Sequence, residues 1–157
     1  PPELPGDLGE VIAHLESEYP NEGCGVILRD GRGRFRIRPM KNVQDRYHAK
    51  DPVSFPRTAR TAYLFDPREQ YTVWEEEAPS RGEQVVCIFH SHADAGAYFS
   101  AEDREMAAPD GRPLLPDVSY LVVAVDGGRA SGAKVFWWDQ GGYQEAPVRF
   151  VEAKAQR

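Results

Sequence analysis

The feature that most constrains the fold is an unbroken apolar run, Val85-Val86-Cys87-Ile88-Phe89, followed at once by His90-Ser91-His92. Such a run of β-branched and aromatic residues predicts a buried strand at the centre of a sheet. Because side chains two residues apart on a strand point to the same side, the two histidines should face one point. Imidazole nitrogen is a good zinc ligand. A bare His-x-His pair at a strand end is, however, also typical of histidines without any metal.

Other segments predict elements that surround this strand. Apolar residues at helical spacing predict an amphipathic helix over 7–18, and Asp66-Pro67 is typical of a helix start, which predicts a helix from there to about Glu77. A third helix should open at Ser100. Further strands are predicted over 24–28, 34–38, 120–125, 133–138 and 143–150. Residues 41–65 predict a long loop with short ordered pieces. This order of elements predicts an α/β or α+β domain with helices packed on a mixed sheet.

Composition limits the classes of function. With 157 residues, 41% of them apolar and 28% charged, the chain is predicted to be one soluble globular domain. The net charge of −6 argues against nucleic-acid binding. No apolar run approaches the roughly 18 residues of a membrane span, and the first residues show no secretory signal. Cys24 and Cys87 lie in apolar runs, so we expect buried, reduced thiols and a cytoplasmic location.

A possible third ligand follows the histidine pair. Seven residues separate His92 from Ser100-Ala101-Glu102-Asp103. Ser-x-x-Asp is close to a capping box, so Asp103 in the first helical turn has an ordinary structural interpretation. Alternatively, its carboxylate turns toward a metal. Two histidines and one carboxylate leave a fourth position open for water, which is the arrangement of a catalytic zinc site.

Zinc-activated water also needs a base that takes up its proton. Glu22 precedes the first predicted strand, in Pro20-Asn21-Glu22-Gly23-Cys24-Gly25, between turn residues. It is one candidate, but spacing alone does not distinguish it from Glu102 or Asp94, and an ordinary surface carboxylate is the alternative.

The combined pattern of an upstream Glu-x-Cys-Gly, His90-Ser91-His92, seven residues and Ser100-x-x-Asp103 resembles the JAMM (MPN-plus, Mov34/PAD-1) zinc metalloproteases. Further segments resemble the short bacterial branch of that family, in which the domain stands alone, and extend the similarity over about residues 7–150. They are Lys41-Asn42-Val43, Phe65-Asp66-Pro67, Tyr120-Leu121-Val122-Val123 and the aromatic strand near Phe136.

The resemblance implies one JAMM/MPN domain over residues 1–157, with a mixed, mainly antiparallel curved sheet flanked by helices as in cytidine deaminases. It also assigns roles. His90, His92 and Asp103 match the ligands of one catalytic Zn²⁺ ion, and Glu22 matches the general base. Ser100 matches the serine that helps to hold the tetrahedral oxyanion. Ser91 belongs to the motif and is not a nucleophile.

The activity implied is hydrolysis, by a Glu-activated metal-bound water, of the peptide or isopeptide bond after the C-terminal glycines of a ubiquitin-like or sulfur-carrier protein. In bacteria, this trimming releases an amino acid such as cysteine. No nucleic acid or membrane is expected as a partner, and no substrate-binding residue is assigned. Two alternatives stay open: a non-catalytic binding or scaffold module on the same fold, and a hydrolase of a small peptide or amide.

Two segments raise further questions. Ala93 and Phe99 stand where the family usually has proline, so we expect a more mobile loop over 93–99. Its Tyr98 and Phe99 have two interpretations, as the lining of a substrate groove or as buried packing. On the predicted strand 34–38, arginine alternates with apolar residues. These arginines form either a solvated edge that prevents strand pairing or a docking face for an acidic partner.

Overall fold

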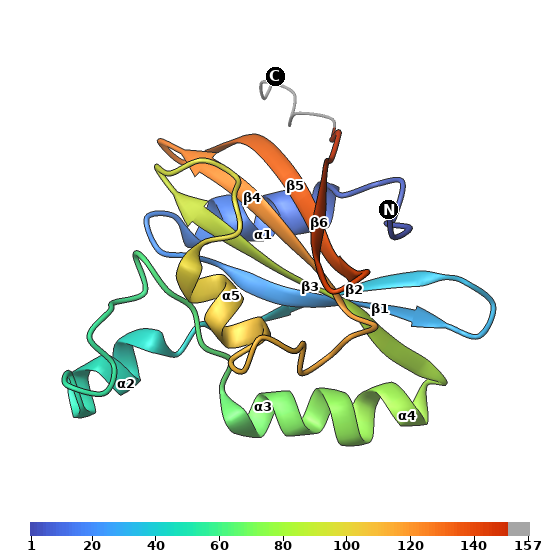
Figure 1. The fold of residues 1–157 in the computed structure, drawn as a ribbon, viewed down its shortest axis with the longest axis horizontal. Helices are drawn as coiled ribbons and strands as arrows, with labels where there is room; N and C mark the ends of the chain where they lie inside the picture. Colours follow the sequence, from blue (N-terminus) through green and yellow to red (C-terminus); the bar gives the residue numbers. More distant parts are fainter. Residues whose placement is uncertain (151–157) are drawn as a thin grey trace.

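The computed structural model describes residues 1–150, which form a six-stranded mixed sheet with helices on both faces (Figure 1). The strands are β1 (Cys24–Asp30), β2 (Phe35–Met40), β3 (Glu83–Ala93), β4 (Ser119–Asp126), β5 (Arg129–Asp139) and β6 (Gly142–Pro147). They lie in the order β2-β1-β3-β4-β5-β6. The β3–β4 pair is parallel and the other neighbouring pairs are antiparallel. The predicted mixed, mainly antiparallel sheet is confirmed.

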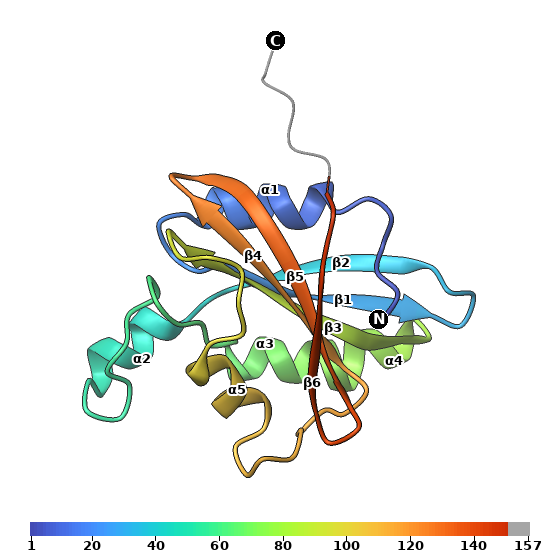
Figure 2. The same ribbon diagram turned by 45° about the horizontal axis from the view of Figure 1, so that its top comes forward.

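Helices cover the sheet from two sides. They are α1 (Gly9–Glu18), α2 (Gln44–Lys50), α3 (Pro67–Tyr71), the π-helical segment η1 (Thr72–Glu77), α4 (Ala78–Ser80) and α5 (Ala101–Ala107). Figure 2 shows α1 on one face of the sheet and the stretch from α3 to α4 on the other. Every helix among the described residues is too short or too polar to cross a lipid bilayer.

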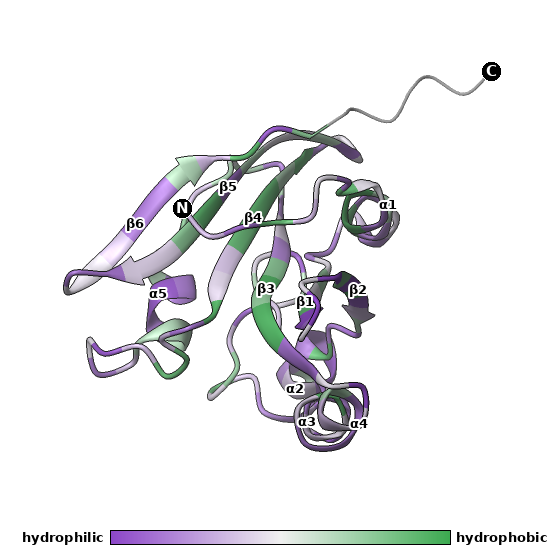
Figure 3. Ribbon diagram, turned by 90° about the vertical axis from the view of Figure 1, so that its right-hand side faces the viewer, coloured by the Kyte–Doolittle hydropathy of each residue, from purple (hydrophilic) through white to green (hydrophobic). Residues whose placement is uncertain are grey.

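Two apolar clusters, one on each face, hold these layers together. On β1, Ile27 packs in the cluster with Val11 and Leu15 of α1, whereas its neighbours Val26 and Leu28 belong to the opposite cluster. This alternation follows from the two-residue period of a strand. Figure 3 shows hydrophobic residues concentrated on the central strands β3 and β4, and more polar ones on β6 at the edge.

The same alternation on β3 places the histidines. Cys87 and Phe89 belong to the α1 side, and Ile88 belongs to the other cluster, so His90 and His92 point away from α1. Because β3 lies between β1 and β4, the backbone of His90 is covered on both sides, and its side chain is fully buried. The predicted central strand therefore carries the histidine pair in its last residues.

The helix that begins after Asp66 is longer than predicted. The Asp66 side chain accepts a hydrogen bond from the Arg68 backbone N–H, which confirms the predicted N-cap. The expected end near Glu77 is wrong, because helical structure continues to Ser80 through α4, which contains Pro79. The wider turns of η1 directly precede this proline, where a regular helix would bring its ring against a carbonyl group.

The segment predicted as a long loop with short ordered pieces contains one short helix, α2, as that prediction allows, and a bridge between Asn42 and Phe65 joins its two ends. His48 lies at the end of α2, where its Nδ1 is 2.7 Å from the carbonyl oxygen of Phe55. Tyr47 packs edge-on against the same phenylalanine. His48 therefore holds the segment together and does not reach the other histidines.

The arginines of β2 are neutralised within the chain. Arg36 forms ion pairs with Glu77 and Glu83 at 2.9 and 2.8 Å, and Arg38 binds Glu69 at 2.8 Å. These acidic residues lie on the helical stretch from α3 to α4 and at the start of β3. Because the guanidinium groups are already paired, the structure favours a structural role on an edge strand over a docking face.

Both cysteines are fully buried and free, as predicted. Burial raises the pKa of the Cys87 thiol to about 12. The thiols are therefore protonated at neutral pH and pack as small apolar side chains.

We predict that Gly25→Ala destabilises the fold, because a Cβ atom there would lie 2.3 Å from Phe89 Cζ and 2.7 Å from the Arg38 carbonyl oxygen. Such overpacking should lower the free energy of unfolding by about 1–3 kcal/mol in urea titrations. Gly132→Ala on β5 is the matched control, since its Cβ would meet no atom within 4 Å. Equal midpoints for the two variants would contradict this account of the β1–β3 packing.

Candidate metal centre and hydrolytic site

The end of β3 and the first turn of α5 bring three buried side chains together. His90 Nε2 lies 3.3 Å from His92 Nε2 and 3.1 Å from Asp103 Oδ1. His92 Nε2 lies 3.1 Å from Asp103 Oδ2. Two nitrogens and a carboxylate thus converge on one point, as the sequence predicted, and these three residues form a cluster that could hold a metal ion.

The geometry of this cluster suits zinc. In tetrahedral coordination with bonds of about 2.0–2.1 Å, neighbouring ligand atoms are separated by about 3.3–3.4 Å. The two histidine nitrogens, 3.3 Å apart, match that spacing, and each of them has a different oxygen of Asp103 at 3.1 Å. Three protein ligands of this kind leave one tetrahedral position for water or substrate. The donor set therefore fits a catalytic metal site.

Asp103 is both the helix cap and a member of the cluster. Its backbone N–H donates to Ser100 Oγ, and its Oδ2 accepts from the Ser100 backbone N–H, both at 3.0 Å. This capping box fixes the carboxylate while it still faces His90 and His92. The capping box is therefore confirmed, and it is compatible with the second interpretation of Ser-x-x-Asp, because the same carboxylate also faces both histidines.

The protonation states suit metal binding. Burial alone raises the pKa of Asp103, but attraction to His90 and hydrogen bonds from both histidines and from the Ser100 N–H outweigh it, so the pKa lies well below its usual value. Burial lowers the pKa of His90 against the opposing influence of Asp103. The cluster thus offers an ionised carboxylate, which is the form that binds metals.

Neighbouring groups orient both imidazoles. His92 Nδ1 lies 3.1 Å from the carbonyl oxygen of Gly96, so a proton on Nδ1 leaves the lone pair of Nε2 for a metal. The ring of His90 stacks on the buried Tyr63, with centroids 4.5 Å apart and 25° between the planes. Within residues 1–150, His90 Nδ1 has no hydrogen-bond partner. Stacking, and not a second hydrogen bond, therefore sets the plane of the His90 ring.

The loop over 93–99 is anchored without the two prolines. Asp94 has a positive φ of 57°, and its backbone N–H donates to the Val125 carbonyl oxygen. Its carboxylate accepts hydrogen bonds from Tyr19 Oη at 2.7 Å and from the Gly127 N–H at 2.9 Å. These contacts tie the loop to the end of α1 and to the β4–β5 turn. They also give Asp94 a structural role.

The two aromatic residues of this loop divide between the two interpretations. Phe99 is buried and stacks on Phe136, with centroids 4.9 Å apart. Tyr98 is half exposed and meets the ring of His92 edge-on. Phe99 is therefore part of the core, and Tyr98 lies at the edge of the site.

Glu22 lies beside the ligand cluster and is held through its backbone. Its N–H donates to the Ala59 carbonyl oxygen at 2.7 Å, and its carbonyl oxygen accepts from Asn42 Nδ2 at 2.8 Å. The next residue, Gly23, exchanges hydrogen bonds with Ser91: its N–H donates to Ser91 Oγ, and its carbonyl accepts the Ser91 N–H. Ser91 thus fixes the Glu22 segment to the strand that carries both histidines.

The environment of Glu22 separates it from the rival carboxylates. Only 5% of Glu22 is exposed, and burial, followed by repulsion from Asp103, raises its pKa to about 9. Glu102 is about half exposed and forms an ion pair with Arg57 at 3.1 Å. The Asp94 carboxylate is engaged in the two hydrogen bonds that anchor the loop over 93–99. A buried carboxyl group with a raised affinity for protons is the best placed of the three to act as a base.

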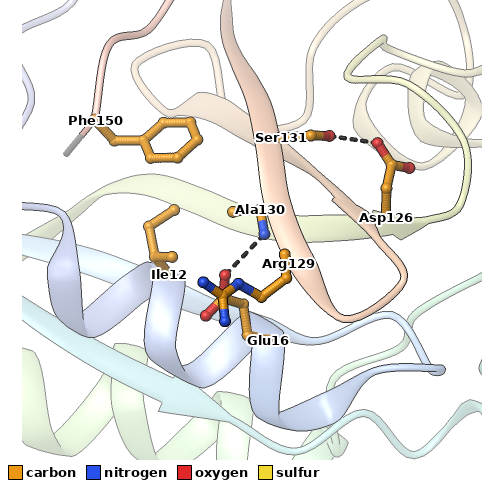
Figure 4. Close-up of a pocket in the computed structure, with 7 residues that line it drawn as sticks. All are labelled: Ile12, Glu16, Asp126, Arg129, Ala130, Ser131 and Phe150. Atoms are coloured by element: carbon orange, nitrogen blue, oxygen red, sulfur yellow. Dashed lines mark hydrogen bonds between the residues drawn. The ribbon is translucent and has the colours of Figure 1, made fainter. Parts of the chain in front are cut away.

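A cavity of about 120 Å³ joins these groups. Its lining includes Glu22, His92 and Ser100 together with Arg57, Arg60, Thr61 and Tyr98. A separate cavity of about 240 Å³ lies on the α1 side, between α1 and β5, and is lined by Glu16, Arg129 and Phe150 among others (Figure 4). This second cavity contains no residue of the ligand cluster.

The sequence did not reveal several residues around the site. Tyr63, Arg57 and Arg60 all come from the irregular segment 41–65, where no periodic pattern indicates which side chains turn inward. From the sequence, Asn42 stands out only as part of Lys41-Asn42-Val43, one of the segments that resemble the short bacterial branch of the JAMM family. In the structure it satisfies four backbone groups: the carbonyls of Glu22 and Ala62 and the N–H groups of Gln44 and Leu64.

Comparison with known proteins agrees with this geometry. Residues 6–140 match the family described as prokaryotic homologs of the JAB domain. The CysO-cysteine peptidase of Mycobacterium tuberculosis is 29% identical over 148 residues, which cover 92% of this chain and 87% of that protein. The desampylase of Haloferax volcanii is 33% identical over 123 residues, or 74% of this chain and 75% of that protein.

A solved structure supports the same fold. The solution structure of a protein from Desulfitobacterium hafniense superimposes with a TM-score of 0.64 at 26% identity, covering 94% of this chain and 90% of that one. The likeness therefore includes the whole sheet and the segments that build the candidate site.

We predict that the metal-free Glu22→Gln variant becomes more stable than the wild type as the pH rises. With a folded-state pKa of about 9 against 4.5, Glu22 keeps in the folded state a proton that the unfolded chain releases. The wild type should therefore lose stability from about pH 4.5 up to about pH 9, and the variant should not. By pH 8, the variant should gain roughly 2–4 kcal/mol in chelator-treated urea titrations.

The control is Glu105→Gln, which removes an exposed carboxylate from α5. Its stability difference from the wild type should be nearly independent of pH. A similarly flat difference for Glu22→Gln would show that Glu22 is not buried beside Asp103 as described.

Proposed function

Because this chain belongs to the family of prokaryotic homologs of the JAB domain, we propose that it is a zinc-dependent peptidase that cleaves after the C-terminal glycines of a ubiquitin-like or sulfur-carrier protein. The observation that carries this proposal is the buried cluster of His90, His92 and Asp103, of which His92 lines one cavity together with Glu22. The names of the two relatives, a CysO-cysteine peptidase and a desampylase, support a substrate of this class.

The metal in this proposal is zinc, held by His90 Nε2, His92 Nε2 and a carboxylate oxygen of Asp103. Zinc suits a site with two imidazoles, one carboxylate and one open position. When bound, it would act as a Lewis acid that makes water a nucleophile at neutral pH and polarises the scissile carbonyl. A cation at this point would also favour the ionised form of Glu22, whose pKa is raised without it.

Glu22 and Ser100 would perform the remaining steps. The Glu22 carboxylate would accept a proton from the attacking water and deliver it to the nitrogen of the leaving amine. Ser100 Oγ already accepts the Asp103 N–H, so its own hydroxyl proton is available for donation toward the developing oxyanion. Ser91 is not a candidate nucleophile, because it is buried and its Oγ accepts a hydrogen bond from the Gly23 N–H.

The alternatives are less well supported. A scaffold module has no need for metal ligands, whereas this chain retains all three, buried and oriented by their neighbours. A hydrolase of small amides would use the same chemistry. The two relatives argue against it, because the names of both point to protein conjugates.

We predict that Glu22→Gln reduces turnover at least a thousandfold while zinc stays bound, because the amide cannot accept a proton. The assay incubates the enzyme with carrier proteins extended beyond Gly-Gly and measures the products by mass spectrometry. Zinc content is measured on the same samples. The matched control, Glu105→Gln, should keep wild-type turnover. Retained turnover in Glu22→Gln would refute the assignment of the base.

A further inference from the structure

The cavity beside the ligand cluster is lined by residues of two chemical kinds. Glu22 and His92 belong to the proposed hydrolytic site, and Arg57 and Arg60 add two positively charged side chains. At about 120 Å³, the cavity is small, so it suits a short terminal segment of a substrate and not a folded domain.

The two arginines are fixed relative to Glu22. Ala59 lies between them in the sequence, and its carbonyl oxygen accepts the Glu22 N–H at 2.7 Å, while its own N–H donates to Asp45 Oδ1 at 2.7 Å. Arg57 is close enough for its charge to oppose the burial that raises the pKa of Glu22. The arginine segment is thus tied directly to the backbone of the proposed base.

The charges of this segment are only partly neutralised. Arg57 forms an ion pair with Glu102 at 3.1 Å, and both side chains remain about half exposed. Arg60 is exposed and has no carboxylate of residues 1–150 within ion-pair distance. One guanidinium group that lines the cavity is therefore available for an anionic group of the substrate.

The chemistry of the leaving group supplies such an anion. When a carrier tail is extended by one amino acid, the scissile nitrogen is attached to a Cα atom that bears the terminal carboxylate. That carboxylate lies next to the nitrogen to which Glu22 would deliver a proton. In an isopeptide, the nitrogen ends a lysine side chain and no carboxylate is near. Guanidinium groups bind carboxylates through paired, charge-assisted hydrogen bonds.

We propose that Arg60, assisted by Arg57, binds the α-carboxylate of the leaving amino acid and so selects carrier proteins extended by a single C-terminal residue over lysine-linked conjugates. This proposal rests on the proposed function and deepens it. Arg60 is the main contact because Arg57 is shared with Glu102. The subsite also explains why the segment 41–65 is attached so firmly to the backbone of Glu22.

The test uses a Gly-Gly carrier protein extended by one cysteine, prepared as the free acid and as the C-terminal carboxamide. The wild type should cleave the free acid with a kcat/KM at least tenfold higher than the carboxamide. In Arg60→Gln, this preference should shrink to less than threefold, mainly through a higher KM for the acid, and the loss of kcat/KM should be several-fold larger on the acid than on the carboxamide. Arg57→Gln should show a smaller loss of the same kind.

Arg32→Gln is the matched control, because it removes an exposed arginine from the turn after β1, away from the cavity. It should keep the wild-type preference. Equal cleavage of acid and carboxamide by the wild type, or an equal loss on both substrates in Arg60→Gln, would overturn the carboxylate subsite while leaving the peptidase intact. Cleavage of neither substrate by the zinc-loaded wild type would instead contradict the proposed function itself, and the subsite with it.

Discussion

The site depends on the contacts that the Asp103 carboxylate makes with the helix cap and with both histidines. The carboxylate accepts the Ser100 N–H that begins α5 and at the same time lies 3.1 Å from one nitrogen of each histidine. The helix cap thus fixes the carboxylate before any metal binds, so little conformational entropy remains to be lost on binding. The contacts with the two histidines also link the first turn of α5 to the end of β3.

The sheet supplies the second constraint. Alternation along β3 directs Phe89 into the α1 cluster and His90 into the opposite layer, and Gly25 on β1 allows the close approach of the Phe89 ring. Hydrogen bonds between Gly23 and Ser91 then hold the segment of Glu22 against the strand that carries both histidines. Ser91, which the sequence places only within a motif, therefore connects Glu22 to the candidate metal site.

The sequence predicted the elements whose local patterns are strong. The first helix, the N-cap at Asp66, the opening of α5 at Ser100 and the central strand were all predicted correctly. For the segment 41–65, the sequence predicted only a long loop with short ordered pieces, which agrees with the short helix α2. The path of this segment could not be predicted, because it rests on long-range contacts such as those of Asn42 and on the stacking of Tyr63 against His90. No local pattern encodes those contacts. The convergence of His90, His92 and Asp103 could be predicted because strand period, helix capping and the family motif together indicate it, whereas the arginines near Glu22 lie on irregular backbone.

The most direct test of this account is a zinc titration of metal-free wild type and Asp103→Asn against a competing chelator. Asparagine keeps a side-chain oxygen that can accept the Ser100 N–H, so it preserves the cap while removing the anionic ligand. The account predicts one zinc ion per wild-type chain, and an affinity at least a hundredfold lower in the variant with its fold intact. A wild type that binds no zinc, or a variant that binds it equally well, would contradict the claim that this capped carboxylate completes a metal site.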